Sequence, residues 1–106
     1  MQGSYLGPDY SDTEIEACLA QCDAKYTKFN EDTVIQHTAD ALADGQAIGW
    51  FQGRMEFGPR SLGNRSILGD PRSPEMQKTL NLKIKYRESF RPFAPSIVRE
   101  DLEEWF

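Results

Sequence analysis

Three arginines stand within twelve residues near the middle of the chain, and each lies close to a glycine. The six residues are Gly53, Arg54, Gly58, Arg60, Gly63 and Arg65. A guanidinium group presents a planar fork of N–H donors that matches phosphate oxygens in pairs and keeps its charge at any accessible pH. Glycines let the backbone approach a ligand closely and point its N–H groups inward. The pattern therefore predicts a loop that binds a phosphorylated ligand.

A purely structural interpretation fits the same charges. Arginines in a solvated loop would pair with nearby acids such as Glu56 and Asp70. The glycine spacing matches neither the G-x-G-x-x-G fingerprint of dinucleotide-binding folds nor the nucleotide P-loop. Any nucleotide site in this loop must therefore be of another kind.

A second basic cluster follows in Lys85, Arg87 and Arg91. Cations at the end of a helix also compensate the helix dipole, so Lys83 and Lys85 alone carry little functional information. Arg91 differs because Pro92 and the two flanking phenylalanines would fix its backbone in a turn. We interpret Arg91 as a fixed ligand contact.

Charge is distributed unevenly along the sequence. The chain has 106 residues and a formal net charge of −5, but residues 53–91 contain nine Lys or Arg against four Asp or Glu. The remaining segments are correspondingly acidic. A local positive field of this kind attracts anionic ligands even when the whole molecule is acidic.

Three helices are expected from cap residues and apolar spacing. Ser11 with Glu14 forms a capping-box pattern for a helix over about residues 12–26. Asn30 can cap a second helix, which a glycine at position 45 would end. Ser73 can cap, and the next proline can open, a third helix that ends near residues 85–87. A further helix begins near residue 101.

Strands are expected between these helices. The apolar residues 47–51 predict a strand buried on both faces, residues 66–68 a brief second strand, and residues 93–98 a third. Alternation of helices and strands indicates an α/β (α+β) fold, with helices packed on a small twisted mixed sheet.

The composition is that of one small soluble globular domain, with 39% hydrophobic and 27% charged residues. No apolar run approaches the length of a membrane span and no signal peptide is recognisable, so we expect a cytoplasmic protein without a membrane partner. Cys18 and Cys22 are expected to pack in the core. With His37 as the one histidine, no metal site is expected within this chain.

Longer strings in the sequence resemble a known family. The strings GWFQGRMEFGPRSLGNRSILGDPR and MQKTLNLKIKYRESFRPFAPSIV closely resemble the C-terminal domain of the nodulation-type and antibiotic-tailoring O-carbamoyltransferases. The opening GPDYSDTEIE resembles the start of that domain, so the resemblance covers nearly the whole chain. One departure is Ser61, where the family more often has alanine. The family domain continues beyond Phe106 and follows a large catalytic domain, so we expect residues 1–106 to be a single partial domain, excised and truncated at its C-terminus.

The resemblance implies a fold similar to threonylcarbamoyl-adenylate synthases and a defined activity. In such enzymes this domain combines carbamoyl phosphate with ATP, expected to come with Mg²⁺, to give carbamoyl adenylate. A metal-dependent site on the missing N-terminal domain then transfers the carbamoyl group to an acceptor hydroxyl. We therefore expect a carbamoyltransferase in the full-length protein and no activity in the isolated segment.

Within this mechanism we assign hypothetical roles to individual residues. Arg60, Lys85 and Arg87 are expected to be catalytic. Substrate binding is expected from Arg54, Glu56, Gly58, Gly63, Asn64, Arg65, Ser66 and Arg91. The cations would offset the repulsion between two bound anions and the charge that moves onto pyrophosphate. Glu56 would orient an arginine, while Asn64 and Ser66 would bond the carbamoyl amide or phosphate oxygens.

Two other functions stay open on the sequence alone. A non-catalytic module could bind a nucleotide or RNA through the same basic surface, although the segment lacks the interleaved exposed aromatics of a stacking platform, so nucleic acid is not the expected partner. A structural interdomain segment could instead pair its arginines with acids on the missing domain. The sequence does not identify the acceptor.

Overall fold

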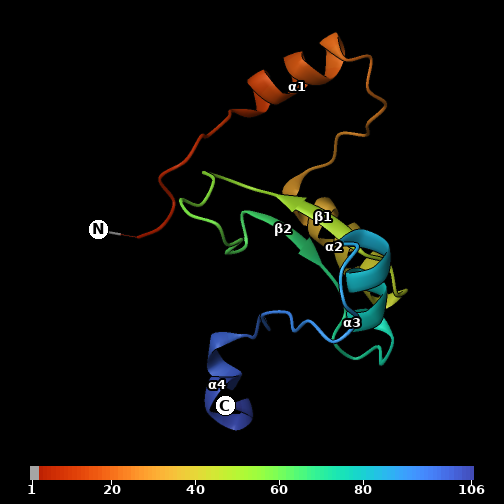
Figure 1. Cartoon of the computed structure of the whole chain (residues 1–106). Coiled ribbons are helices and arrows are strands. Elements are labelled where there is room, and N and C mark those ends of the chain that lie inside the picture. The colour runs from red at the N-terminus through yellow and green to blue at the C-terminus, as the bar shows by residue number, and fades with distance from the viewer. Residues whose placement is uncertain (1–2) are drawn as a thin grey trace.

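The computed structural model describes residues 3–106 and has a mixed α/β fold, as expected (Figure 1). The elements in chain order are α1 (Asp12–Gln21), α2 (Glu31–Ala43), β1 (Ile48–Phe51), β2 (Arg65–Leu68), α3 (Met76–Thr79), the π-helical turn η1 (Leu80–Ile84), the 3-10 turn η2 (Arg99–Asp101) and α4 (Leu102–Trp105). The loop between β1 and β2 and the turn after η1 carry the two basic clusters.

The predicted helix starts are confirmed for α1 and α2. The hydroxyl of Ser11 accepts a hydrogen bond from the N–H of Glu14 at 3.2 Å, while the Glu14 carboxylate accepts one from the N–H of Ser11 at 2.7 Å. The Oδ1 of Asn30 accepts from the N–H of Thr33 at 2.8 Å. Each cap involves residues three apart, so local sequence is sufficient to predict it.

Two helix boundaries differ from the prediction. Helix α1 ends at Gln21 instead of near residue 26, because Asp23 adopts a left-handed backbone with φ of 52° and turns the chain away. Helix α3 begins at Met76, and the side chain of Ser73 does not cap it. Only the carbonyl of Ser73 takes part, accepting from the N–H of Met76 at 3.2 Å.

The described residues contain one sheet, made of β1 and β2 paired antiparallel. Trp50 pairs with Ser66, and Phe51 pairs with Arg65. The expectation that β1 is buried on both faces was wrong, because Gly49 and Phe51 are exposed. Only part of that face is covered: the guanidinium group of Arg65 stacks on the Phe51 ring, and the ring centre of Tyr10 lies 6.4 Å from that of Phe51.

The third predicted strand, residues 93–98, was also wrong, because this segment has no regular structure. It contains Pro95 and follows Pro92, and neither residue has an N–H group to donate to a neighbouring strand. The predicted burial of Cys18 and Cys22 was wrong as well, since both thiols are exposed on α1. In Figure 1, α1 and α4 extend away from the sheet.

The apolar core is small and lies where α3 meets the end of β2. Met76 and Leu80 are the buried hydrophobic residues of the described chain, with 6% and 5% of their surface exposed. A methyl group added at Gly69 would stand 2.8 Å from the Cγ of Met76, so the backbone and the helix approach closely here. The radius of gyration is 15.8 Å, compared with about 13 Å for a compact domain of this length. Within residues 3–106, no helix has the length and apolarity needed to cross a bilayer.

The N-terminal segment, residues 3–11, pairs with the loop that follows β1. The N–H of Gly7 donates to the carbonyl of Met55 at 2.9 Å, and the N–H of Met55 donates to the carbonyl of Pro8 at 2.9 Å. The N–H of Phe57 donates to the carbonyl of Ser4 at 2.6 Å. The segment therefore acts as an additional extended neighbour that fixes the path of residues 53–57.

We expect Gly7→Ala to loosen this pairing. A Cβ at position 7 would stand 2.9 Å from both the carbonyl oxygen and the Cβ of Met55, so one of the two chains must shift. Overpacking of this kind destabilises by about 1–3 kcal/mol, which chemical denaturation would measure. Gly49→Ala is the matched control, because a Cβ there meets nothing within 4 Å. An unchanged midpoint for Gly7→Ala would contradict the pairing.

Candidate functional site

The loop that joins β1 to β2, residues 53–63, is called here the arginine loop, and a pair of carboxamides closes its base. The N–H of Gln52 donates to the carbonyl of Asn64 at 3.0 Å, and its Nε2 donates to the Oδ1 of Asn64 at 3.1 Å. The Nδ2 of Asn64 donates to the carbonyl of Arg54 at 2.7 Å. Both ends of the Asn64 side chain are thus bonded within the protein, and this side chain shapes the loop.

Glu56 is the internal anchor of the arginine loop. Its side chain is buried, with the residue only 5% exposed. One carboxylate oxygen, Oε1, accepts hydrogen bonds from the backbone N–H groups of Leu62, Asn64 and Arg65 at 2.9, 2.7 and 3.2 Å. The intervening N–H of Gly63 donates to the hydroxyl of Ser66 at 3.1 Å. Four consecutive N–H groups therefore point into the protein.

The backbone N–H groups of the loop point inward, as predicted from its glycines. The loop does form a concave cluster of backbone donors, which is a typical anion-binding shape, but its own carboxylate occupies the cluster. Glu56 orients Arg65 through the Arg65 backbone. Gly58 and Gly63 have positive φ values of 114° and 109°, which favour glycine and let the loop reverse its direction. Anionic ligands at this site must therefore be met mainly by side-chain cations.

The pKa of Glu56 should report this closure. The hydrogen bond from the Leu62 N–H and those from Asn64 and Arg65 lower its pKa from the ordinary value of 4.5 to about 2, although burial acts in the opposite direction. Because the pKa is lower in the folded loop, the stabilisation is complete above pH 4.5 and is lost as the pH falls toward 2. We expect the amide resonances of Leu62, Asn64 and Arg65 to titrate together near pH 2 in NMR spectra. A common midpoint near 4.5 would show that the loop is not closed by Glu56.

The guanidinium group of Arg65 donates hydrogen bonds to nearby backbone carbonyls. Its Nη1 donates to the carbonyls of Gln52 and Asn64, each at 2.9 Å, and its Nη2 lies 3.5 Å from the carbonyl of Pro8. The guanidinium carbon lies 3.5 Å from the centre of the Phe51 ring, a cation–π geometry. Arg65 therefore joins the N-terminal segment, both sides of the loop base and β1.

Arg54 and Arg60, which lie within the arginine loop, are more exposed than Arg65. The Nη1 of Arg54 donates to the carbonyl of Gly7 at 3.4 Å, a long contact. Arg60 is exposed and forms none of the ion pairs found between residues 3 and 106. Its fork of donors is therefore available to a ligand.

An open pocket of about 420 Å³ lies over the sheet beside this loop. It is lined by Gly49, Trp50 and Phe51 of β1 and Ile67 of β2, and polar groups come from Ser61, Arg65, Ser66 and Lys85. The pocket thus joins the first basic cluster to the second through Arg65 and Lys85. Two cations, two hydroxyl groups and two aromatic residues in the lining suit a ligand that has both anionic and planar parts.

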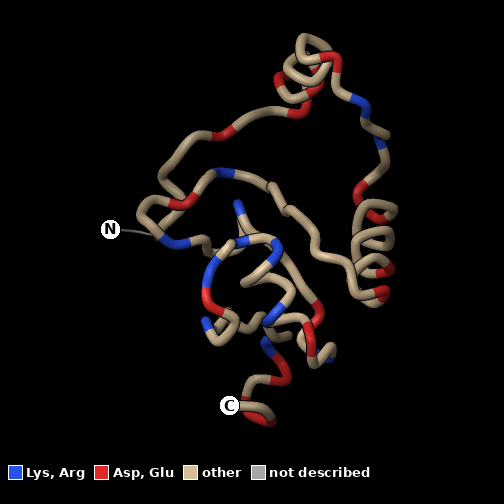
Figure 2. The backbone as a smooth tube through the Cα atoms, turned by 45° about the vertical axis from the view of Figure 1, so that its right-hand side comes forward, with Lys and Arg blue, Asp and Glu red and all other residues tan. Residues whose placement is uncertain are grey.

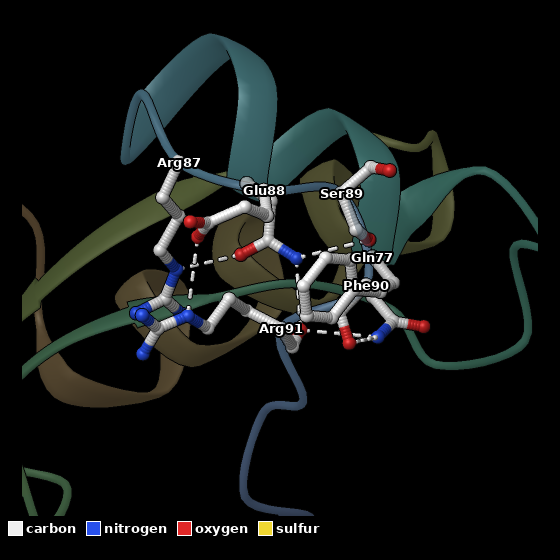
Figure 3. Close-up of polar contacts among 7 residues, drawn as sticks. Gln77, Arg87, Glu88, Ser89, Phe90 and Arg91 are labelled. Atoms are coloured by element: carbon white, nitrogen blue, oxygen red, sulfur yellow. Dashed lines mark hydrogen bonds and ion pairs between the residues drawn. The ribbon is translucent and has the colours of Figure 1, made fainter.

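The turn of residues 85–91, called here the basic turn, holds Arg87 and Arg91 around Glu88 (Figure 3). The Nε of Arg91 lies 3.2 Å from the Glu88 carboxylate, and both groups are about half exposed. The pKa of Glu88 is lowered by a hydrogen bond to its own backbone, then by the bond to Arg91 and its charge, and in smaller part by the charge of Arg87. The guanidinium carbon of Arg87 lies 4.9 Å from the centre of the Phe93 ring.

The structure brings part of the predicted set together. Arg65, Ser66 and Lys85 line one pocket, whereas Arg54, Arg60, Arg87, Arg91 and Asn64 are not in its lining. Most of the basic segments occupy the middle of the molecule, between helices that carry acids (Figure 2). The acid-pairing alternative holds for Arg72, whose Nη2 lies 2.7 Å from the Asp70 carboxylate.

Three residues of this region were missed from the sequence. Trp50 was assigned only to the buried strand, and Ser61 was noted only as a departure from the family pattern, yet both line the pocket. Asn81 was given no role, yet it is completely buried and bonded to Arg87. An asparagine next to Leu80 and three residues before Ile84 was the available sequence signal.

Comparison with known proteins places the chain in a family. Residues 39–106 match the family described as Carbamoyltransferase C-terminus. Because the match covers more than half of the sequence, the chain belongs to this family, and the resemblance recognised in the sequence is confirmed.

Individual relatives agree with this assignment. The chain is 54% identical over 108 residues to the protein sll1178 of Synechocystis sp., covering 100% of this chain and 18% of that protein. It is 47% identical over 107 residues to the nodulation protein NolNO of Sinorhizobium fredii, covering 100% and 16%. It is 45% identical over 78 residues to the 3'-hydroxymethylcephem-O-carbamoyltransferase of Streptomyces clavuligerus, covering 72% and 15%. The chain therefore spans about a sixth of the length of the curated relatives it matches.

Proposed function

We propose that this chain is the part of an ATP-using O-carbamoyltransferase that binds carbamoyl phosphate and ATP and forms carbamoyl adenylate. The observation that carries the proposal is the pocket whose lining includes Arg65 and Lys85, from separate basic clusters, together with Trp50 and Phe51. The family assignment and a relative named as an O-carbamoyltransferase support the reaction class. Carbamoyl phosphate, ATP and water would give carbamoyl adenylate, pyrophosphate and phosphate.

The residues of the site suit an electrostatic role. Two polyanions repel each other in a confined site, and fixed cations offset this repulsion most strongly where charge develops on the leaving pyrophosphate. Lys85 can contact phosphate oxygens from one wall of the pocket, and the exposed Arg60 can close over the ligand from the arginine loop. The Ser66 hydroxyl accepts from Gly63 and keeps its own hydrogen for a ligand oxygen. No covalent nucleophile is required.

Magnesium would reach this site on the phosphates of ATP. Mg²⁺ is usually bound through one or two carboxylates together with substrate phosphates. The described residues contain no group of three or more metal-ligating side chains. In this proposal the metal-dependent transfer of the carbamoyl group to a hydroxyl takes place on the rest of the protein.

We also propose that this remainder packs against the chain. Large apolar side chains are widely exposed on the described residues, including Tyr26 at 51%, Trp105 at 68% and Phe106 at 77%. Helices α1 and α4 present no buried residue. Exposed apolar surface of this extent is unusual for a free monomer and is typical of an interface. A further part of the same protein, as the length of the relatives implies, is the partner that fits.

The test is exchange of labelled pyrophosphate into ATP that depends on carbamoyl phosphate, measured on the full-length protein. We expect exchange in the full-length protein and none in residues 1–106 alone. Lys85→Met should lower the exchange rate by about a hundredfold, the loss that follows removal of one preorganised donor. Lys83→Met, two residues earlier and not in the pocket lining, is the control. Full exchange without carbamoyl phosphate, or equal rates for the two variants, would contradict the proposal.

A further inference from the structure

Asn81 is fully buried, with 0% of its surface exposed. A buried carboxamide is stable only when its donors and acceptor are bonded. The Nδ2 of Asn81 donates to the carbonyl of Ser89 at 3.2 Å and to that of Arg91 at 2.8 Å. Its Oδ1 accepts from the Nε of Arg87 at 2.7 Å. One side chain therefore bonds both the backbone of the basic turn and an arginine that the turn carries.

Gln77 supports the same turn from one helical turn earlier. Its Nε2 donates to the carbonyl of Phe90 at 3.1 Å and to that of Arg91 at 3.0 Å (Figure 3). Residues four apart lie on the same face of a helix. The Arg91 carbonyl thus accepts from both carboxamides, and we call Gln77 and Asn81 the carboxamide clamp.

The helix is distorted where the clamp acts. The N–H of Lys85 donates to the carbonyl of Leu80 at 2.9 Å, five residues back, which is the π-helical bond of η1. The N–H of Arg87 donates to the backbone carbonyl of Asn81 at 2.8 Å. Between them Tyr86 has a left-handed φ of 53°. Strained backbone and π-helical turns both concentrate at functional sites, where the surrounding contacts maintain them.

The clamp has a direct consequence for Arg87. Asn81 occupies its Nε, and the ring of Phe93 lies 4.9 Å from its guanidinium carbon. This leaves the two terminal nitrogens, Nη1 and Nη2, as a fork with a fixed direction. Donors that are fixed before binding lose less entropy and need no reorganisation when the ligand arrives.

We infer that Gln77 and Asn81 are positioning residues that hold the Arg87 fork and the backbone of Arg91 ready for a phosphorylated ligand. This inference rests on the proposed function, because it assumes that the two arginines bind carbamoyl phosphate or ATP. It adds two uncharged residues that do not line the pocket. The clamp acts on the ligand only through the arginines.

A double-mutant cycle in the full-length protein tests the inference. Asn81→Leu keeps the size of the side chain but removes all three bonds, and Arg87→Lys keeps the charge but removes the Nε bond. We expect Asn81→Leu to raise the KM for carbamoyl phosphate at least about tenfold in the wild type, the effect of one charged hydrogen bond. In the Arg87→Lys background the same change should alter KM less than about twofold, because the shared bond is already lost. Lys78→Gln on α3 is the control.

The outcomes distinguish a failure of the inference about Asn81 from a failure of the proposed function. An equal rise in KM in both backgrounds, or no rise at all, would show that Asn81 does not act through Arg87. If Arg87→Lys alone leaves KM at the wild-type value, the ligand role of Arg87 in the proposed function is wrong. Should Asn81→Leu lack a cooperative melting transition, the same cycle uses Gln77→Met with Arg91→Lys. Gln77 is exposed, so its loss leaves the core intact, and additive effects in that cycle would overturn the inference.

Discussion

Glu56→Gln in the full-length protein is expected to lower kcat/KM for carbamoyl-phosphate-dependent ATP turnover by about a hundredfold, the loss that a displacement of about 1 Å can cause in a site. The substitution removes the charge that three backbone N–H groups share and keeps the shape of the side chain. Hydrogen bonds to a charged acceptor are about twice as strong as neutral ones. The arginine loop, which carries Arg60 and leads into Arg65 on β2, would then lose its closure, although no proposed ligand contact has been altered.

Two further variants separate loop closure from the loss of one negative charge. Glu31→Gln, at the exposed start of helix α2, removes the same charge outside the arginine loop and should leave kcat/KM unchanged. Glu56→Ala leaves the donors exposed to small anions, so added formate should restore part of the activity by entering the vacated position. Wild-type kinetics in Glu56→Gln would mean that the carboxylate has no part in shaping the site.

The sequence was sufficient where the interaction is local. The caps at Ser11 and Asn30 join residues three apart, and the patterns that predict them do not depend on the rest of the fold. Strand β2 was placed within one residue of its observed start. The failed strand at residues 93–98 was also locally readable, because Pro95 removes a donor from the middle of it.

Long-range contacts could not be predicted in the same way. The pairing of Gly7 with Met55 joins positions 48 residues apart, and no local pattern marks either partner. Burial depends on which surfaces meet, so the exposure of Cys18 follows from what covers α1. Similarly, the arginine loop was recognised as a cluster of donors, but its occupation by Glu56 depends on the exact path of the backbone.

The two basic clusters are organised in the same way. In each, an uncharged or oppositely charged side chain is buried and satisfies the backbone of a turn: Glu56 in the arginine loop and Asn81 in the basic turn. The cations themselves remain half-buried or exposed. Burying the organiser while leaving the guanidinium groups accessible avoids the large penalty of burying an unpaired charge.

This division predicts different behaviour for Arg65, at the start of β2, and Arg60, in the arginine loop. Arg65→Lys is expected to lower both the melting temperature and kcat/KM, because an ammonium cannot reproduce two backbone contacts and the stacking on Phe51. Each lost charged hydrogen bond corresponds to about 1.5–3 kcal/mol, so a decrease of at least about tenfold in kcat/KM is expected. Differential scanning fluorimetry and steady-state kinetics would measure the two effects.

The contribution of Arg60 to ligand binding is expected to depend only on its positive charge. Because it is exposed and pairs with no acid in residues 3–106, Arg60→Lys should keep the melting temperature and most of the activity. Arg60→Ala should keep the melting temperature but raise the KM for carbamoyl phosphate at least about tenfold, the loss of one charged contact. An Arg60→Ala protein with unchanged KM would remove Arg60 from the site. An Arg65→Lys protein with wild-type melting would show that Arg65 does not connect the N-terminal segment, the loop base and β1, and its charge would then be free to act on the ligand directly.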